Sequence, residues 1–174
     1  MRYELDCVAI VASSECDRAT YERLIAKRRD SGLYPASVDF RVLADPPGRV
    51  GSGAGTLHAL RLLAQRPAGM PSRVLVVHAG GEARRVPSYA PEGKLFMPIP
   101  VASSAIAPPV LLDALLTLFA AYPWRESELV VTTGDVVVDV DDWSGADARG
   151  QVCGFAVPAE LDLGARHGVF RLDP

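Results

Sequence analysis

Short, largely apolar runs that recur along this 174-residue chain constrain its fold more than any other feature. They are continuous rather than alternating apolar and polar residues, which is typical of strands buried on both faces of a parallel sheet. Helical patterns separate them, so the sequence predicts the α/β class. The predicted strands are 6–12, 39–44, 73–79 and 128–133 with a resumption at 136–140, followed by 151–157 and 168–172.

Three helices are predicted between these strands, at about 17–30, 56–65 and 108–121. Serines at 13 and 14 can cap the first helix, and Gly32 can end it. The residues expected to form the inner stripe of the second helix are Leu57, Leu60, Leu63 and Ala64. The proline-rich segment 87–109 is predicted to be an ordered loop anchored by its apolar residues at 94–97.

Composition and charge exclude several classes of partner. A net charge of −3 gives no overall attraction for nucleic acid. The longest apolar region, 106–122, contains two prolines and an aspartate and is shorter than the ~20 residues of a membrane span. The three cysteines have no metal-ligand spacing, and the first residues lack the build of a secretory signal, so we expect a cytoplasmic protein.

A glycine and arginine motif follows the predicted strand 73–79. Gly80 and Gly81 let the backbone approach a ligand closely, and Arg84 and Arg85 add positive charge and hydrogen-bond donors suited to phosphate oxygens. In an open α/β sheet, ligands bind where the strands end at their carboxyl termini. The motif alone is explained as well by a tight turn followed by a solvated pair of charges.

Two further candidates are Lys94, which could reach the same anion, and Asp135, which with Gly134 lies just past the strand 128–133. A carboxylate at such a position can hold Mg²⁺ together with substrate phosphates. Each has an ordinary structural alternative, because an aspartate after a strand is usually a turn or capping residue. His78, within a buried strand, is expected to be a packed, hydrogen-bonded histidine.

A third glycine-rich segment lies at 51–56 and is predicted to be a loop before the second helix. It lacks the lysine of a phosphate-binding P-loop and does not follow the first strand as a dinucleotide fingerprint does. Its candidate ligand-binding residues are Gly51, Ser52, Gly53, Gly55 and Thr56.

Taken together, the segments VLVVHAGGEARRVP, GKLFMPIP and LVVTTGDVVV resemble nucleotidyltransferases that join a sugar 1-phosphate to a nucleoside triphosphate. With ADPPGRVGSGAGTLHAL upstream, the resemblance is to the pyrophosphorylase part of the bifunctional L-fucokinase/GDP-fucose pyrophosphorylase family. It covers nearly the whole chain. Ala83 and Arg84 replace the Gly-Thr of the superfamily loop, and Gly93 replaces the proline before its lysine.

The resemblance implies a Rossmann-like three-layer nucleotidyltransferase fold and transfer of a nucleotide from GTP to fucose 1-phosphate or a similar sugar. It also implies that Gly80 and Gly81 cradle the phosphates, that Arg85 and Lys94 are catalytic, and that Asp135 binds Mg²⁺. In ordinary members the signature strand comes first, whereas here two βα units precede it. A permuted strand order would bring 51–56 beside 80–85 to contact the base.

Relatives in this superfamily have a longer catalytic domain. We therefore expect residues 1–174 to be the nucleotide-binding portion of a longer protein that continues into a kinase domain. Two alternatives remain open: a truncated relative that binds nucleotide without transferring it, and a purely structural α/β domain. Titration with GTP and ATP, with and without Mg²⁺, separates them.

Overall fold

The computed structural model describes residues 4–48, 51–79, 93–100, 107–136, 139–143, 152–156, 158 and 160–164. The chain divides into two compact units, Met1–Asp141 and Asp142–Pro174. The first unit contains a sheet and its covering helices, and the second contains the short helix α4 (Leu161–Gly164).

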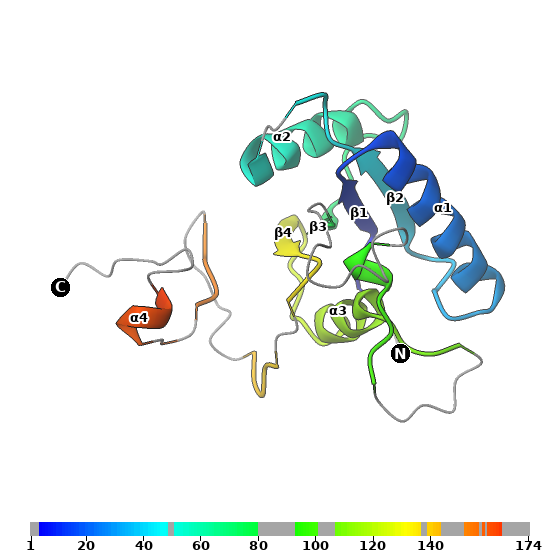
Figure 1. Ribbon diagram of the computed structural model, residues 1–174. Helices are drawn as coiled ribbons and strands as arrows, with labels where there is room; N and C mark the ends of the chain where they lie inside the picture. The colour runs from blue at the N-terminus through cyan, green and yellow to red at the C-terminus, as the bar shows by residue number, and fades with distance from the viewer. Residues whose placement is uncertain are drawn as a thin grey trace. The chain divides into compact units, whose positions relative to one another are not determined.

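The sheet of the first unit has four strands, all parallel, in the order β2-β1-β3-β4 (Figure 1). This arrangement confirms the α/β class and the parallel sheet expected from the sequence. The strands are β1 (Cys7–Ala12), β2 (Asp39–Ala44), β3 (Arg73–His78) and β4 (Glu128–Thr133). The strand that leads into the glycine and arginine motif, β3, therefore lies between β1 and β4.

The two central strands are apolar on both faces because both faces are covered. Every residue of β1 is buried, and so are the four central residues of β3. Helix α2 (Gly51–Ala64) packs on one face. The core between α2 and the sheet consists of Cys7, Ala9, Val11, Ala59, Leu63, Val74 and Val76. Figure 1 shows α2 and helix α3 (Leu111–Ala120) on opposite sides of the strands, which gives three layers.

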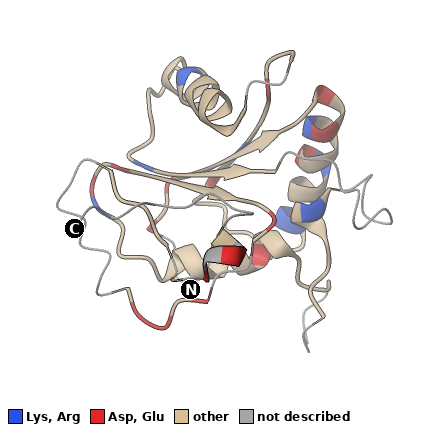
Figure 2. Ribbon diagram, turned by 60° about the vertical axis from the view of Figure 1, so that its left-hand side comes forward, with Lys and Arg blue, Asp and Glu red and all other residues tan. Residues whose placement is uncertain are grey.

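Helix α1 (Glu15–Asp30) begins directly after Ser14, whose hydroxyl accepts the backbone N–H of Asp17 at 3.1 Å. The predicted start at 17 is therefore two residues late, because this cap fixes the first turn. The helix ends at Asp30, as predicted, and Gly32 follows with φ of +70°. Charged residues are concentrated on α1 in Figure 2, and Tyr21 and Ile25 form its buried side.

Helix α2 corrects two sequence-based expectations. Residues 51–55 are its first turns and not a loop, and Leu57 is 70% exposed, so it does not belong to the inner stripe. Ala64 is exposed as well. The inner side is formed by Gly55, Ala59 and Leu63 at helical spacing. Small residues at the first two of these positions let the helix approach the sheet closely, and this packing offsets the poor helix propensity of glycine.

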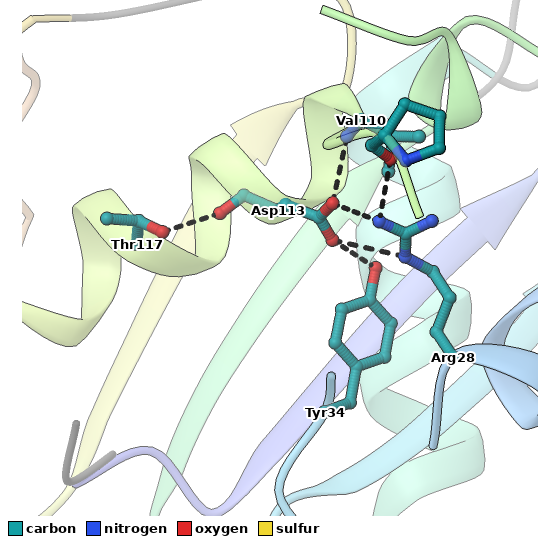
Figure 3. Close-up of polar contacts among 6 residues, drawn as sticks. Arg28, Tyr34, Val110, Asp113 and Thr117 are labelled. Carbon is teal, nitrogen blue, oxygen red and sulfur yellow. Dashed lines mark hydrogen bonds and ion pairs between the residues drawn. The ribbon is translucent and has the colours of Figure 1, made fainter. Parts of the chain in front are cut away.

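A partly buried ion cluster, formed by Arg28, Tyr34 and Asp113, joins α1 to α3 (Figure 3). The Asp113 carboxylate pairs with the Arg28 guanidinium and accepts the Tyr34 hydroxyl at 2.8 Å. It also accepts the backbone N–H of Val110 at 2.8 Å, which fixes the first turn of α3. Both Asp113 oxygens therefore have donors within the protein. Arg28 also donates to the carbonyl of Pro108 at 3.3 Å.

Three predicted strand segments have other outcomes. The chain turns at Gly134 instead of continuing as a strand: its N–H donates to the His78 carbonyl at 2.8 Å, and the described residues 136, 139 and 140 are not in a strand. Residues 152–156 are exposed and are not in a strand. The segment 168–172 lies outside the described residues.

No helix in the described part of the chain combines the length and the apolar character that a membrane span needs.

Candidate functional site

The carboxyl ends of the strands meet at one edge of the parallel sheet, and the candidate side chains gather there. Asp45 follows β2 and donates its N–H to the carbonyl of Ala12, at the end of β1, at 2.8 Å. Gly134 follows β4 and is bonded to the end of β3 through the His78 carbonyl. This edge is where open α/β sheets bind ligands.

Lys94 and Asp135, two of the predicted site residues, meet at this edge. The Lys94 ammonium donates to Asp135 Oδ2 at 3.0 Å, and the Thr133 hydroxyl donates to Asp135 Oδ1 at 2.6 Å. Those hydrogen bonds, from Thr133 first and then from Lys94, lower the pKa of Asp135, so the carboxylate is ionised at neutral pH. The side chains of Lys94 and Asp135 are 30% and 42% exposed, which leaves both within reach of a ligand.

Lys94 is held in place by a one-turn 3₁₀-helix, η2 (Lys94–Phe96). Leu95 and Phe96 are buried, as the sequence predicted for this apolar anchor. The Leu95 side chain also reaches the end of β4, where a Cβ on Gly134 would lie 3.1 Å from its Cδ1. The lysine therefore projects from a packed turn and not from an unanchored loop.

The start of α2 touches the end of β3. The Thr56 hydroxyl donates to the Ser52 carbonyl at 2.9 Å and lies 2.7 Å from Nε2 of His78. A hydroxyl has a single proton, and Thr56 donates it to the Ser52 carbonyl. The contact with His78 is therefore a hydrogen bond in which Nε2–H of His78 donates to the Thr56 oxygen. His78 is thus the packed, hydrogen-bonded histidine that was predicted, and burial lowers its pKa while the nearby Asp45 carboxylate opposes the shift.

Asp45 is a residue of this edge that the sequence interpretation missed. Its Oδ1 is shielded from solvent and has no hydrogen-bond partner among the described residues. A Cβ on Gly55 would lie 2.6 Å from that oxygen and 3.4 Å from Cε1 of His78, so only glycine fits between the helix and these side chains. Its position was an available signal, because Asp45 comes directly after β2, just as Asp135 comes shortly after β4.

The remaining predicted ligand-binding residues have two outcomes. Gly51, Ser52 and Gly53 are exposed in the first turn of α2, where backbone N–H groups have no partner within the helix. Gly80, Gly81, Arg84 and Arg85 lie outside the described residues. Of the predicted site residues, Lys94 and Asp135 are in contact, and Thr56 lies against His78, two residues before Gly80.

Comparison with known proteins shows the family to which this chain belongs. The model of the fucose pyrophosphorylase domain family matches residues 71–174. Human fucose-1-phosphate guanylyltransferase is 29% identical over an alignment covering 97% of this chain and 28% of that protein. The bifunctional fucokinase/GDP-fucose pyrophosphorylase of Arabidopsis thaliana is 28% identical, over 94% of this chain and 18% of its own length.

A bacterial relative, the L-fucokinase/L-fucose-1-P guanylyltransferase of Bacteroides fragilis, is 26% identical over 78% of this chain and 16% of its own. The chain thus spans less than a third of the length of these curated relatives. No solved structure matches it. Because the family model covers more than half of the sequence, including β3, η2 and β4, the chain belongs to the fucose pyrophosphorylase family.

Proposed function

We propose that this chain is the nucleotide-binding part of a sugar-1-phosphate guanylyltransferase, which converts fucose 1-phosphate and GTP to GDP-fucose and pyrophosphate. The Lys94–Asp135 pair carries the proposal: it places a cation and an anion side by side, partly exposed, at the ligand-binding edge of the sheet. Membership of the fucose pyrophosphorylase family and the names of the relatives support the choice of substrates.

In this reaction an oxygen of the sugar 1-phosphate attacks the α-phosphorus of GTP, and the bond to the leaving pyrophosphate breaks. No covalent protein nucleophile is needed, so the protein acts through positioning and fixed charge. Lys94 and Arg85 are assigned to the negative charge that grows on the pyrophosphate. Gly80, Gly81 and Arg84 are assigned to the other phosphate oxygens.

The first two turns of α2 are assigned to the guanine base, through Gly51, Ser52, Gly53, Gly55 and Thr56. Thr56 supports this role because it lies against the last residue of β3, two positions before Gly80. A base bound at these turns would share the sheet edge with phosphates bound at Lys94.

Asp135 fits a magnesium ligand. Mg²⁺ is usually bound through one or two carboxylates, with water and substrate phosphates completing its shell, and Asp135 is ionised and partly exposed. The described residues contain no group of three metal-ligating side chains, so a site here depends on the nucleotide for its other oxygens. The ion would neutralise charge on the nucleotide phosphates, and Lys94 would leave Asp135 for a phosphate oxygen.

The larger protein is proposed to be a cytoplasmic enzyme whose remaining length supplies the sugar pocket and, as in the bifunctional relatives, a fucokinase domain. Cys7, Cys16 and Cys153 are free thiols, which agrees with a reducing compartment.

The experiment uses the full-length protein and measures Mg²⁺-dependent GTP binding and pyrophosphate exchange with fucose 1-phosphate. Asp135→Asn and Arg85→Ala are expected to lower turnover at least tenfold, the effect of losing one electrostatic contact worth about 2–3 kcal/mol. Asp30→Asn, at an exposed position of α1, is the matched control. GTP binding without pyrophosphate exchange would indicate a protein that binds nucleotide but does not transfer it. Absence of GTP binding would contradict the proposal.

A further inference from the structure

One tyrosine of α1 contacts the chain at two points that are distant in sequence. The Tyr21 hydroxyl donates to the carbonyl of Ala79, directly after β3, at 3.3 Å. Gly93 packs on the same side chain: a Cβ there would lie 2.1 Å from the Tyr21 oxygen and 2.8 Å from Cε1 and Cζ. Gly93 also has φ of +72°, so this position suits glycine for two separate reasons.

Tyr21 is itself held firmly. It is buried on the inner side of α1, and its ring lies 5.4 Å from the ring of Phe96, centroid to centroid. Burial raises the pKa of Tyr21 to about 12, so the hydroxyl keeps the proton that it donates to Ala79. The side chain is therefore a fixed point on which residues 79 and 93 meet.

Both contacts lead directly to the Lys94–Asp135 pair. Gly93 immediately precedes Lys94, whose ammonium bonds Asp135. Ala79 immediately follows His78, whose carbonyl accepts the N–H of Gly134, the neighbour of Asp135. A shift of Tyr21 would move the backbone next to each member of the pair.

We propose that Tyr21 is a positioning residue: by gripping Ala79 and Gly93 it holds Lys94 at Asp135, in the place where the triphosphate binds. The hydroxyl, and not only the ring, is needed for this grip. The effect of Tyr21 on catalysis rests on the proposed function. The contacts of Tyr21 with Ala79 and Gly93 are a property of the fold and do not depend on it.

Tyr34 provides a matched control. It is also a buried tyrosine whose hydroxyl makes one hydrogen bond, to Asp113 at 2.8 Å. Its ring stacks on Phe40, near the start of β2 and so at the end of the sheet opposite the candidate site. Tyr34→Phe therefore removes the same atoms from the core without touching Ala79 or Gly93.

The catalytic test is a double-mutant cycle in the full-length protein, with GTP and fucose 1-phosphate as substrates. Tyr21→Phe is expected to lower kcat/KM roughly three- to tenfold, the effect of losing one hydrogen bond, and Tyr34→Phe to change it less than about twofold. In a Lys94→Met background, Tyr21→Phe is expected to have little further effect, because the two residues act through one group. Full additivity with Lys94→Met would overturn the proposal.

A second measurement does not depend on the reaction. The amides of Phe96 and Met97 are bonded to the carbonyls of Gly93 and Lys94, and their hydrogen exchange without nucleotide reports the grip. Tyr21→Phe is expected to speed this exchange, and Tyr34→Phe to leave it unchanged. Equal exchange in both variants would overturn the role of Tyr21, whereas an inactive wild-type protein with faster exchange in Tyr21→Phe would overturn only the proposed function.

Discussion

Two polar clusters of this molecule use the same kinds of side chain for different purposes. In the partly buried ion cluster, the Arg28 and Asp113 side chains are 12% and 23% exposed, and each Asp113 oxygen has donors within the protein. At the sheet edge, the Lys94–Asp135 pair is more exposed, and Asp45 nearby has an oxygen without a partner among the described residues.

The two clusters differ in how many hydrogen-bond acceptor positions of the carboxylate remain available to a ligand. A carboxylate with all its acceptor positions filled can join two helices but has nothing to offer a ligand. Asp135 has one donor on each oxygen, so the Lys94–Asp135 contact can be exchanged for contacts with a phosphate oxygen and a metal ion. We infer that the first cluster maintains the fold and that the second performs the chemistry, and the predictions below test this division.

The largest effect is expected from breaking the partly buried ion cluster. Asp113→Ala removes the acceptor of three donors, on Arg28, Tyr34 and Val110, and at about 1 kcal/mol or more for each donor it should lower the free energy of unfolding by about 3–5 kcal/mol. Urea denaturation measures the loss, with Asp30→Asn as the exposed control. GTP affinity of the folded fraction should be unchanged, and a specific loss of affinity would contradict the division.

The opposite result is expected at the edge. Lys94→Met should lower turnover about tenfold to a hundredfold, a loss of about 2–3 kcal/mol of transition-state stabilisation. The free energy of unfolding should change by less than about 1 kcal/mol, because a partly exposed ion pair contributes little to stability. Lys27→Met, on the exposed side of α1, controls for loss of charge. Destabilisation without loss of turnover would make this pair structural as well.

Two glycines of α2 test how closely the helix approaches Asp45. Gly55→Ala puts a methyl group 2.6 Å from Asp45 Oδ1, and overpacking of about 1–3 kcal/mol should exceed the gain in helix propensity of about 1 kcal/mol. Gly53→Ala has no neighbour within 4 Å among the described residues, so it should stabilise the protein by about 0.5–1 kcal/mol. Thermal unfolding of the two variants should therefore shift in opposite directions.

The smallest effect is expected from His78. Burial lowers its pKa in the folded protein below the ordinary value near 6.5, so between these values the unfolded chain binds more protons. The free energy of unfolding should thus rise with pH through this window, by less than about 1.4 kcal/mol per pH unit, and level off above it. His78→Gln should flatten the profile measured by denaturation between pH 5 and 7. If the free energy of unfolding rises equally steeply with pH in His78→Gln, the pH dependence must come from another titratable group.

Much of the fold was predictable because its signals are local. The bounds of β2 and β4 agree with the predicted strands. The end of α1 was predictable from a single residue, Gly32, which follows it. Local reasoning failed at the start of α2, where glycines predicted a loop. There the packing of Gly55 and Ala59 against the sheet decides the conformation, and that packing depends on strands that the segment itself does not contain.

The candidate site was predictable in its parts but not in its pairings. Lys94 and Asp135 were singled out separately by residue type and position, yet their contact joins a 3₁₀ turn to the end of β4. Tyr21 lies on the buried side of its helix, but the partner of its hydroxyl depends on how the chain returns after β3. Such long-range contacts follow from tertiary geometry, which periodicity does not encode.

The central position of β1 has a consequence for synthesis of the protein. Its six apolar residues emerge first, but one of its two neighbours, β3, emerges more than 60 residues later. Until then one edge of β1 is unpaired, and pairings between distant segments form slowly. A nascent chain stalled before β3 should therefore be prone to aggregation and should depend on chaperones, whereas the four-stranded sheet can form once β4 has been synthesised.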